Sequence, residues 1–186
     1  MTKLKLAVIV GSNRKNSINR QLAEALVHLV GERVEASFIR IDDLPMYNQD
    51  LEGNRPDAVN RFTREVAAAE ALLLVTPEFN RSIPAVLKNA IDWGSKPLTS
   101  NVWNGKVAAI TGTSPGAIGT AVGQQHLRQI LGILGTLVMG GEAYITFKPD
   151  LIEDGKIVNE GTKAFLQAYI DRFLNVATRL SEAMVE

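Results

Sequence analysis

The first segment that suggests chemistry is the polar stretch at residues 11–20, Gly-Ser-Asn-Arg-Lys-Asn-Ser-Ile-Asn-Arg, between an apolar run and a helical pattern. Ser12, Ser17 and Asn19 offer short hydrogen-bonding groups, and Arg14 offers a charged fork that suits phosphate oxygens. A helix that begins here adds free N–H groups and a dipole that favours an anion. The stretch predicts a phosphate site, although a capping Ser17 and a solvated Arg14 would also explain it.

The absence of two common nucleotide-binding motifs indicates which kind of phosphate this stretch would bind. It contains neither Gly-x-Gly-x-x-Gly nor a Gly-Lys-Ser/Thr ending, which are the motifs of dinucleotide and triphosphate loops. Several small donors can surround a phosphate monoester. The sequence therefore favours a terminal phosphate over a pyrophosphate or a triphosphate.

A second polar segment, residues 76–84, reads Thr-Pro-Glu-Phe-Asn-Arg-Ser-Ile-Pro. Its two prolines stiffen the backbone, so its N–H and C=O groups can address the edge of a flat heterocycle such as an isoalloxazine. Phe79 offers an aromatic face, but an aromatic side chain taken alone is more typical of packing. We expect Glu78 to act through its main chain.

A third polar segment, residues 111–116, reads Thr-Gly-Thr-Ser-Pro-Gly. Its glycines permit a close approach of the backbone, and its hydroxyl and N–H groups can face a developing negative charge, as on a reduced flavin. An ordinary tight turn after a strand explains the same residues. Only the convergence of this segment with the other two favours a binding site.

The elements that position these segments can be predicted from periodicity. Strands are expected at residues 4–10, 34–41, 71–75, 107–111 and 136–139, with helices over residues 18–29, 59–69, 83–91, 127–134 and 165–180. Strands that alternate with helices imply right-handed crossovers, and the continuous run Leu-Leu-Leu-Val at 72–75 implies burial on both faces. This pattern predicts an α/β fold, a doubly wound five-stranded parallel sheet of order 2-1-3-4-5 with helices on both faces.

In that order the crevice opens at the carboxyl ends of strands one and three. The three polar segments follow strands one, three and four, so they are expected to meet along this edge. No internal repeat or linker interrupts the chain, and residues 1–186 are expected to form a single domain.

Composition excludes several other classes of protein. The 186 residues carry 20 basic and 20 acidic side chains and no cysteine, so a nucleic-acid partner, disulfides and thiolate chemistry are not expected. The apolar stretch at the amino terminus is too short to cross a membrane and has no signal-peptide cleavage pattern. We expect a cytoplasmic protein without membrane insertion.

With these residues in view, the chain resembles the NADPH-dependent FMN reductase family, including its bacterial quinone and chromate reductases. The resemblance rests on Gly-Ser-Asn-Arg-Lys-Asn-Ser-Ile-Asn at 11–19 and on Thr-Pro-Glu-Phe-Asn at 76–80 through Leu-Lys-Asn-Ala-Ile-Asp-Trp at 87–93. It implies a flavodoxin-like fold, an FMN cofactor and NADPH or NADH as hydride donor. It further implies a homodimer or homotetramer that reduces small-molecule electron acceptors: quinones, free flavins, azo compounds, or oxyanions such as chromate.

The resemblance also implies which residues bind the cofactor. Residues of the first polar segment would surround the phosphate, residues of the second would line the flavin ring, and residues of the third would complete the pocket. They are Ser12, Arg14, Ser17, Ile18 and Asn19; Pro77, Glu78, Phe79 and Asn80; and Thr113 and Ser114.

Two positions depart from the family pattern. Phe79 stands where a tyrosine is often found, which removes a hydroxyl but keeps the ring. Residues 119–126 lack the second glycine, the arginine and the tyrosine that some relatives carry before His-Leu-Arg. A tetramer contact built on those groups is therefore in question.

The expected mechanism is a ping-pong reaction in which the cofactor carries the chemistry, so no catalytic side chain and no metal ligand are assigned. His28 is expected to be solvated, and His126 to be structural or at a subunit contact. Trp93 and Trp103 suit either the core or an interface. Arg14, Lys15 or Arg81 can attract a ribose phosphate, which predicts a modest preference for NADPH.

Two alternatives stay open at this point. A flavodoxin-type electron carrier would bind FMN equally well, although the neutral charge disfavours steering between redox proteins. A flavin-free binding or regulatory module is also compatible with the fold, because fold does not establish function. Direct oxidation of NADPH, and retention of FMN, separate these alternatives.

Overall fold

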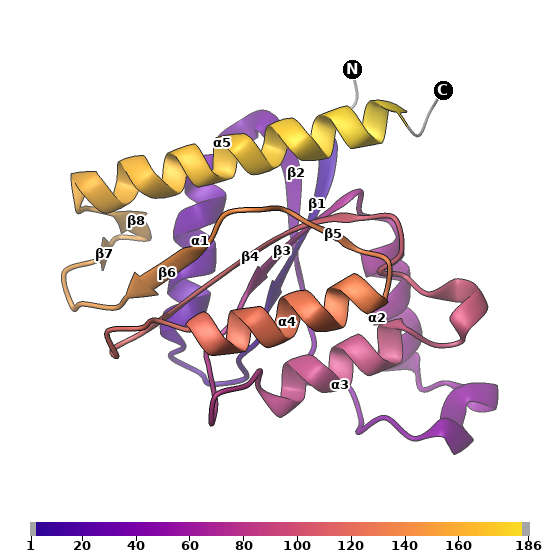
Figure 1. The fold of residues 1–186 in the computed structure, drawn as a ribbon. Helices are drawn as coiled ribbons and strands as arrows, with labels where there is room; N and C mark the ends of the chain where they lie inside the picture. The colour runs from indigo at the N-terminus through magenta and orange to yellow at the C-terminus, as the bar shows by residue number, and fades with distance from the viewer. Residues whose placement is uncertain (1–2, 184–186) are drawn as a thin grey trace.

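The computed structural model describes residues 3–183, and its main sheet is parallel throughout. The strand order is β2-β1-β3-β4-β5, with β6 also paired to β4, so the predicted 2-1-3-4-5 order is confirmed (Figure 1). The strands are β1 (Leu4–Val10), β2 (Val34–Ile39), β3 (Ala71–Val75), β4 (Val107–Ser114), β5 (Leu137–Val138) and β6 (Ala143–Thr146). This order defines a flavodoxin-like α/β fold.

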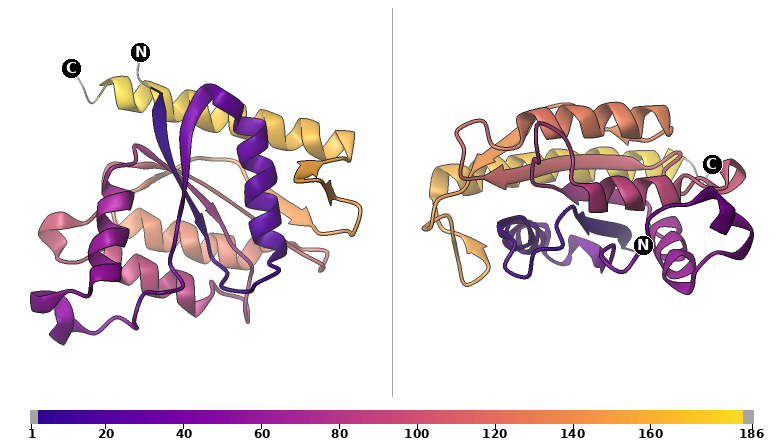
Figure 2. Two further views of the ribbon diagram at one scale, coloured as in Figure 1. Left: turned by 180° about the vertical axis from the view of Figure 1, so that it is seen from behind. Right: turned by 90° about the horizontal axis from the view of Figure 1, so that it is seen from below.

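Helices cover both faces of the sheet, as predicted, and Figure 2 shows the sheet among them from two further sides. They are α1 (Ile18–Val30), α2 (Asp57–Ala67), α3 (Ala85–Gly94), α4 (Ala121–Ile133) and α5 (Glu160–Ala183). Because side chains alternate along a strand, β3 divides its side chains between two cores. Leu73 packs with α1 and α5, whereas Leu72 and Leu74 pack with α2, α3 and α4.

The predicted strand at 136–139 is one of two short strands beside β4. β5 pairs with Val107 and Ala108, and β6 pairs with residues 111–114. The chain leaves the sheet between them at Gly141, whose φ of 85° is a left-handed conformation that favours glycine. Arg128 of α4 donates to the carbonyls of Met139 and Gly141 and holds this break in place.

Other predicted bounds also differ from the structure, among them those of two strands and of α3. The strand predicted at 34–41 ends at Ile39, and the one predicted at 107–111 continues to Ser114. Ile83 precedes α3, which begins after Pro84, since proline lacks the N–H that a helix interior needs. The small hairpin of β7 (Ile152–Glu153) and β8 (Lys156–Ile157) was not predicted.

The sequence left open whether Trp93 and Trp103 lie in the core or at an interface. Both side chains are fully buried, so within this chain they are core residues. Each indole N–H donates to a backbone carbonyl, of Pro45 and Ile91 respectively.

Across residues 3–183, no helix is at once long and apolar enough to span a membrane.

Candidate functional site

The three polar segments meet at the carboxyl edge of the sheet, as the strand order predicts, and hydrogen bonds join them to one another. Gly11 N–H donates to Val75 C=O at 2.9 Å, and Thr76 N–H donates to Thr111 C=O at 3.0 Å. A methyl group on Gly11 would lie 2.5 Å from Thr76 Oγ1, so the first two segments can approach this closely only because position 11 is glycine. The edge is therefore one connected structure.

The first segment leads from β1 into α1 and ends on a helix cap. Ser17 has an extended backbone, and its buried hydroxyl oxygen accepts the N–H of Arg20 at 3.3 Å. Within residues 3–183, the N–H groups of Ser17, Ile18 and Asn19 have no hydrogen-bond partner. These donors lie at the positive end of the helix dipole, where an anion is most stable.

Arg14 and Ser12 lie on the outer side of the same loop. Arg14 is exposed, and its own N–H donates to Ser12 Oγ at 3.3 Å. No carboxylate in the described part of the chain forms an ion pair with Arg14. A guanidinium and several unpaired N–H groups on one loop fit a phosphate monoester.

Asn19 is buried and bonded to the third segment. Its side-chain Nδ2 donates to Thr113 C=O, and its Oδ1 accepts Thr113 N–H, both at 2.9 Å. Its side-chain amide therefore joins α1 to β4, and its backbone N–H is the group left without a partner among the described residues.

The third segment was predicted to form a loop or turn after the strand, but its first residues continue the strand. Thr113 and Ser114 are the last residues of β4, where Thr113 Oγ1 donates to Ile145 C=O at 2.8 Å and Ser114 Oγ to Gly119 C=O at 2.7 Å. These polar side chains suggested a loop, but within the fold Thr113 has its partner on β6 and Ser114 has its partner in the loop after β4. Close approach does matter here, because a methyl group on Gly112 would lie 2.0 Å from Thr76 C=O.

The second segment forms a tight turn at the same edge. Phe79 and Ser82 exchange both backbone hydrogen bonds, at 2.9 and 3.0 Å. Between them, Asn80 and Arg81 have φ values of 52° and 65°, a left-handed conformation that is uncommon for residues other than glycine. Such strain is held in place by the surrounding contacts and is typical of functional loops.

The side chains of this turn differ in their surroundings. Phe79 is 56% exposed, so its ring does not pack in the core of this chain. Pro77 is half-buried and Asn80 is exposed. The turn thus presents an aromatic face and backbone groups at the edge, as a site for a flat ring requires.

Two side chains fasten this turn to α4: His126, for which a structural role was one expectation, and Glu78, whose side-chain role the sequence did not indicate. The Glu78 carboxylate accepts Gly123 N–H at 3.0 Å, and His126 Nδ1 lies 3.1 Å from Ser82 Oγ. His28, in contrast, is exposed on α1, as expected. Nothing in the local pattern signals the contacts of Glu78 and His126, because they join elements about 45 residues apart.

A groove of about 510 Å³ lies between the first loop and the end of β2. Its walls include Arg14, Lys15 and Arg40. Arg40 is hydrogen-bonded to Asp42 at 2.8 Å, which lowers the pKa of that carboxyl. Within residues 3–183, Arg14 and Lys15 form no ion pair, so these two side chains give the groove a positive charge that no carboxylate neutralises.

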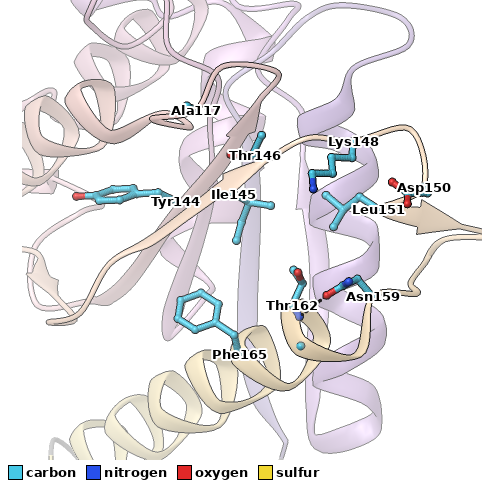
Figure 3. Close-up of a pocket in the computed structure, with 11 residues that line it drawn as sticks. Ala117, Tyr144, Ile145, Thr146, Lys148, Asp150, Leu151, Asn159, Thr162 and Phe165 are labelled. Carbon is cyan, nitrogen blue, oxygen red and sulfur yellow. Dashed lines mark hydrogen bonds between the residues drawn. The ribbon is translucent and has the colours of Figure 1, made fainter.

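A larger groove, of about 660 Å³, opens between β6 and the start of α5 (Figure 3). Ile145 and Phe165 face its interior, and Thr162 N–H is bonded to Asn159 Oδ1 at its floor. Ala117 connects it to the loop after β4, but none of the predicted site residues lines it. The sheet edge, and not this groove, brings the predicted residues together.

Comparison with known proteins agrees with this geometry. Residues 4–150 match the family model described as NADPH-dependent FMN reductase, and the chain belongs to that family.

The individual relatives cover almost the whole chain. It is 46% identical over 172 residues to a 2-hydroxy-1,4-benzoquinone reductase of a Burkholderia species, across 91% of this chain and 94% of the relative. It is 44% identical over 170 residues to a quinone reductase of Pseudomonas putida, across 90% and 91%. Among solved structures, FerB, an NAD(P)H:acceptor oxidoreductase of Paracoccus denitrificans, superposes with a TM-score of 0.91 at 41% identity, covering 95% of this chain and 98% of FerB.

Proposed function

We propose that this protein is an FMN-dependent NAD(P)H:quinone oxidoreductase. The observation that carries the proposal is the sheet edge, where a loop with unpaired N–H groups and an uncompensated arginine adjoins a rigid turn with an exposed aromatic ring. Membership of the NADPH-dependent FMN reductase family and the named relatives support it. The likeness to quinone reductases suggests the class of acceptor.

The proposed cofactor site assigns a task to each segment. Ser12, Arg14, Ser17 and the N–H groups of Ile18 and Asn19 bind the phosphate. Residues 77–80 line the ring, and the end of β4 at Thr113 and Ser114 closes the pocket. Since the hydroxyls of Thr113 and Ser114 are bonded within the fold, these residues shape the pocket and leave contact with the ring to their backbone.

When bound, FMN would supply the hydride chemistry that links NAD(P)H to an electron acceptor, and we propose that the two substrates use the site in a ping-pong sequence. The protein's part is to hold the ring in place and to keep one face open to two successive substrates. Exposed Phe79 and Asn80 border that open face. We assign no side chain to acid–base or nucleophilic catalysis.

An open face also bears on the range of acceptors. Quinones are the proposed principal class, by likeness to the relatives. Free flavins, azo compounds and oxyanions such as chromate are proposed as further acceptors, because an open site over a planar ring places few shape requirements on an oxidant.

The assembly and location are proposals as well. We propose a homodimer or homotetramer in the cytoplasm, by analogy with the family. Light scattering coupled to gel filtration gives the mass directly, and a strictly monomeric, fully active protein would contradict the assembly.

The function is tested by spectroscopy of the purified protein. Loaded with FMN and free of oxygen, it should lose its visible flavin absorption on addition of NADPH and regain it on addition of a benzoquinone. Flavin that binds but is not bleached by NADPH or NADH would favour an electron carrier. A protein that does not bind flavin would contradict the proposal altogether.

A further inference from the structure

We propose that the side chain of Glu78 is a positioning residue, which caps α4 and thereby fixes the strained turn at 79–82 in the geometry that FMN requires. This inference rests on the proposed function. It assigns to the Glu78 carboxylate a task separate from the cofactor contacts of its backbone.

The carboxylate occupies a position that a surface loop residue rarely has. Only 8% of the Glu78 side chain is exposed, and Oε2 accepts the N–H of Gly123 at 3.0 Å. Gly123 is the third residue of α4, and Thr120, the residue before the helix, makes no capping hydrogen bond with its side chain. Glu78 therefore caps α4 from another loop, with its negative charge at the favourable end of the helix dipole.

The same side chain constrains the turn that follows it. Glu78 Oε1 accepts from Arg81 Nη1 at 3.1 Å, and Arg81 is one of the two residues with positive φ. Residues other than glycine hold this conformation at a cost of about 1–3 kcal/mol each, so the neighbouring contacts must maintain it. Glu78, the residue before the turn, thus contacts Arg81 within it, and His126 contacts Ser82, its last residue.

The α4 side of the contact leaves little free space. A methyl group on Gly123 would lie 3.1 Å from Ser82 C=O and 3.4 Å from Glu78 Cβ. Glycine at this helical position thus permits α4 to support the turn closely, although alanine would favour the helix itself. The two elements form one unit at the edge of the proposed flavin site.

Four variants separate this role from a general loss of stability. Glu78→Gln keeps an oxygen that accepts the Gly123 N–H, whereas Glu78→Ala does not. Gly123→Ala displaces the turn from the helix side while improving helix propensity. Glu65→Ala is the matched control, because it removes a carboxylate that is paired with Arg61 on α2, remote from the turn.

Two measurements apply to each variant. The first is amide hydrogen exchange of Gly123 in the flavin-free protein, which reports the hydrogen bond without any cofactor. The second is the FMN dissociation constant from fluorescence quenching. Glu78→Ala should speed the exchange and weaken FMN binding by about tenfold each, the effect of one hydrogen bond to a charged group.

The remaining variants have their own expected results. Glu78→Gln should bind FMN within about threefold of the wild type, Gly123→Ala should bind it at least about threefold more weakly, and Glu65→Ala should match the wild type. Wild-type affinity in Glu78→Ala or in Gly123→Ala would overturn the proposal, as would equal losses in Glu78→Ala and Glu78→Gln. Failure of the wild type itself to bind FMN would instead contradict the proposed function, and the exchange of Gly123 would still report on the cap.

Discussion

The side-chain amide of Asn19 pairs with the backbone of Thr113 in both directions, with both hydrogen bonds at 2.9 Å. β3 ends at Val75 opposite Thr111, and beyond that point no strand in the described part of the chain pairs with β4 on this side. The Asn19 side chain makes the two hydrogen bonds with Thr113 that a residue of a neighbouring strand would otherwise make. One side chain thus continues the sheet and fixes the start of α1 at the proposed phosphate site.

We predict that Asn19→Ala lowers the free energy of unfolding by about 2 kcal/mol, because it leaves the buried N–H and C=O of Thr113 without partners. FMN should bind more weakly as well, since α1 loses its link to β4. Urea denaturation and flavin titration measure the two effects. Asn16→Ala, exposed in the same loop, should change stability by less than about 0.5 kcal/mol. Equal stability of the two variants would refute this role of Asn19.

Tyr169 performs the equivalent task on the other side of β4. Its buried hydroxyl accepts Ile110 N–H at 3.1 Å and donates to Ile110 C=O at 2.8 Å, in the gap between β5 and β6. Tyr169→Phe should therefore cost about 1–3 kcal/mol of stability in urea denaturation. Tyr144→Phe, whose hydroxyl lies near the surface with Gln125, should cost much less. A Tyr169→Phe protein as stable as Tyr144→Phe would contradict this account.

The same tyrosine predicts a dependence on alkaline pH. Burial raises the pKa of Tyr169 above its ordinary value of about 10. Its contribution to stability is complete below that ordinary value and is lost as the pH rises towards the folded-state pKa, because the unfolded chain ionises first. Above pH about 10, the wild type should lose stability more steeply than Tyr169→Phe. Parallel curves of unfolding free energy against pH would show that the buried hydroxyl plays no such part.

The phosphate site can be tested by comparing two flavins. Arg14→Ala should weaken FMN binding by about tenfold or more, the effect of one charge-assisted hydrogen bond, while leaving riboflavin binding unchanged. Riboflavin lacks the phosphate and so does not use Arg14. Arg64→Ala, an exposed arginine on α2, is the control and should affect neither ligand. Equal weakening of both flavins by Arg14→Ala would mean that Arg14 does not bind the phosphate.

Lys15 provides a test of the expected NADPH preference. It lines the cationic groove beside the first loop, where Arg40 is already paired with Asp42. Lys15→Ala should lower kcat/KM for NADPH about threefold to tenfold more than for NADH, because only NADPH carries the ribose phosphate. Steady-state kinetics with both donors measure this ratio. An unchanged ratio would place the ribose phosphate elsewhere.

Periodicity predicted the strands, the helices and the two covered faces, because Leu72, Leu74 and their neighbours are apolar without interruption. The sheet order and the edge where the polar segments meet followed from the known strand order of doubly wound sheets. Periodicity failed where long-range contacts decide the structure. Thr113 was predicted in a turn, yet it continues β4 because Asn19 and β6 satisfy its polar groups. The carboxylate of Glu78 was overlooked because its partner, Gly123, lies 45 residues further along the chain.

Anaerobic addition of NADPH to the FMN-loaded protein, followed in the visible spectrum, shows whether the protein transfers hydride from the nicotinamide to its flavin. We expect the flavin absorption to bleach within the time of turnover and to return when a benzoquinone is added. Bound flavin that stays oxidised with both NADPH and NADH would contradict the proposed oxidoreductase function.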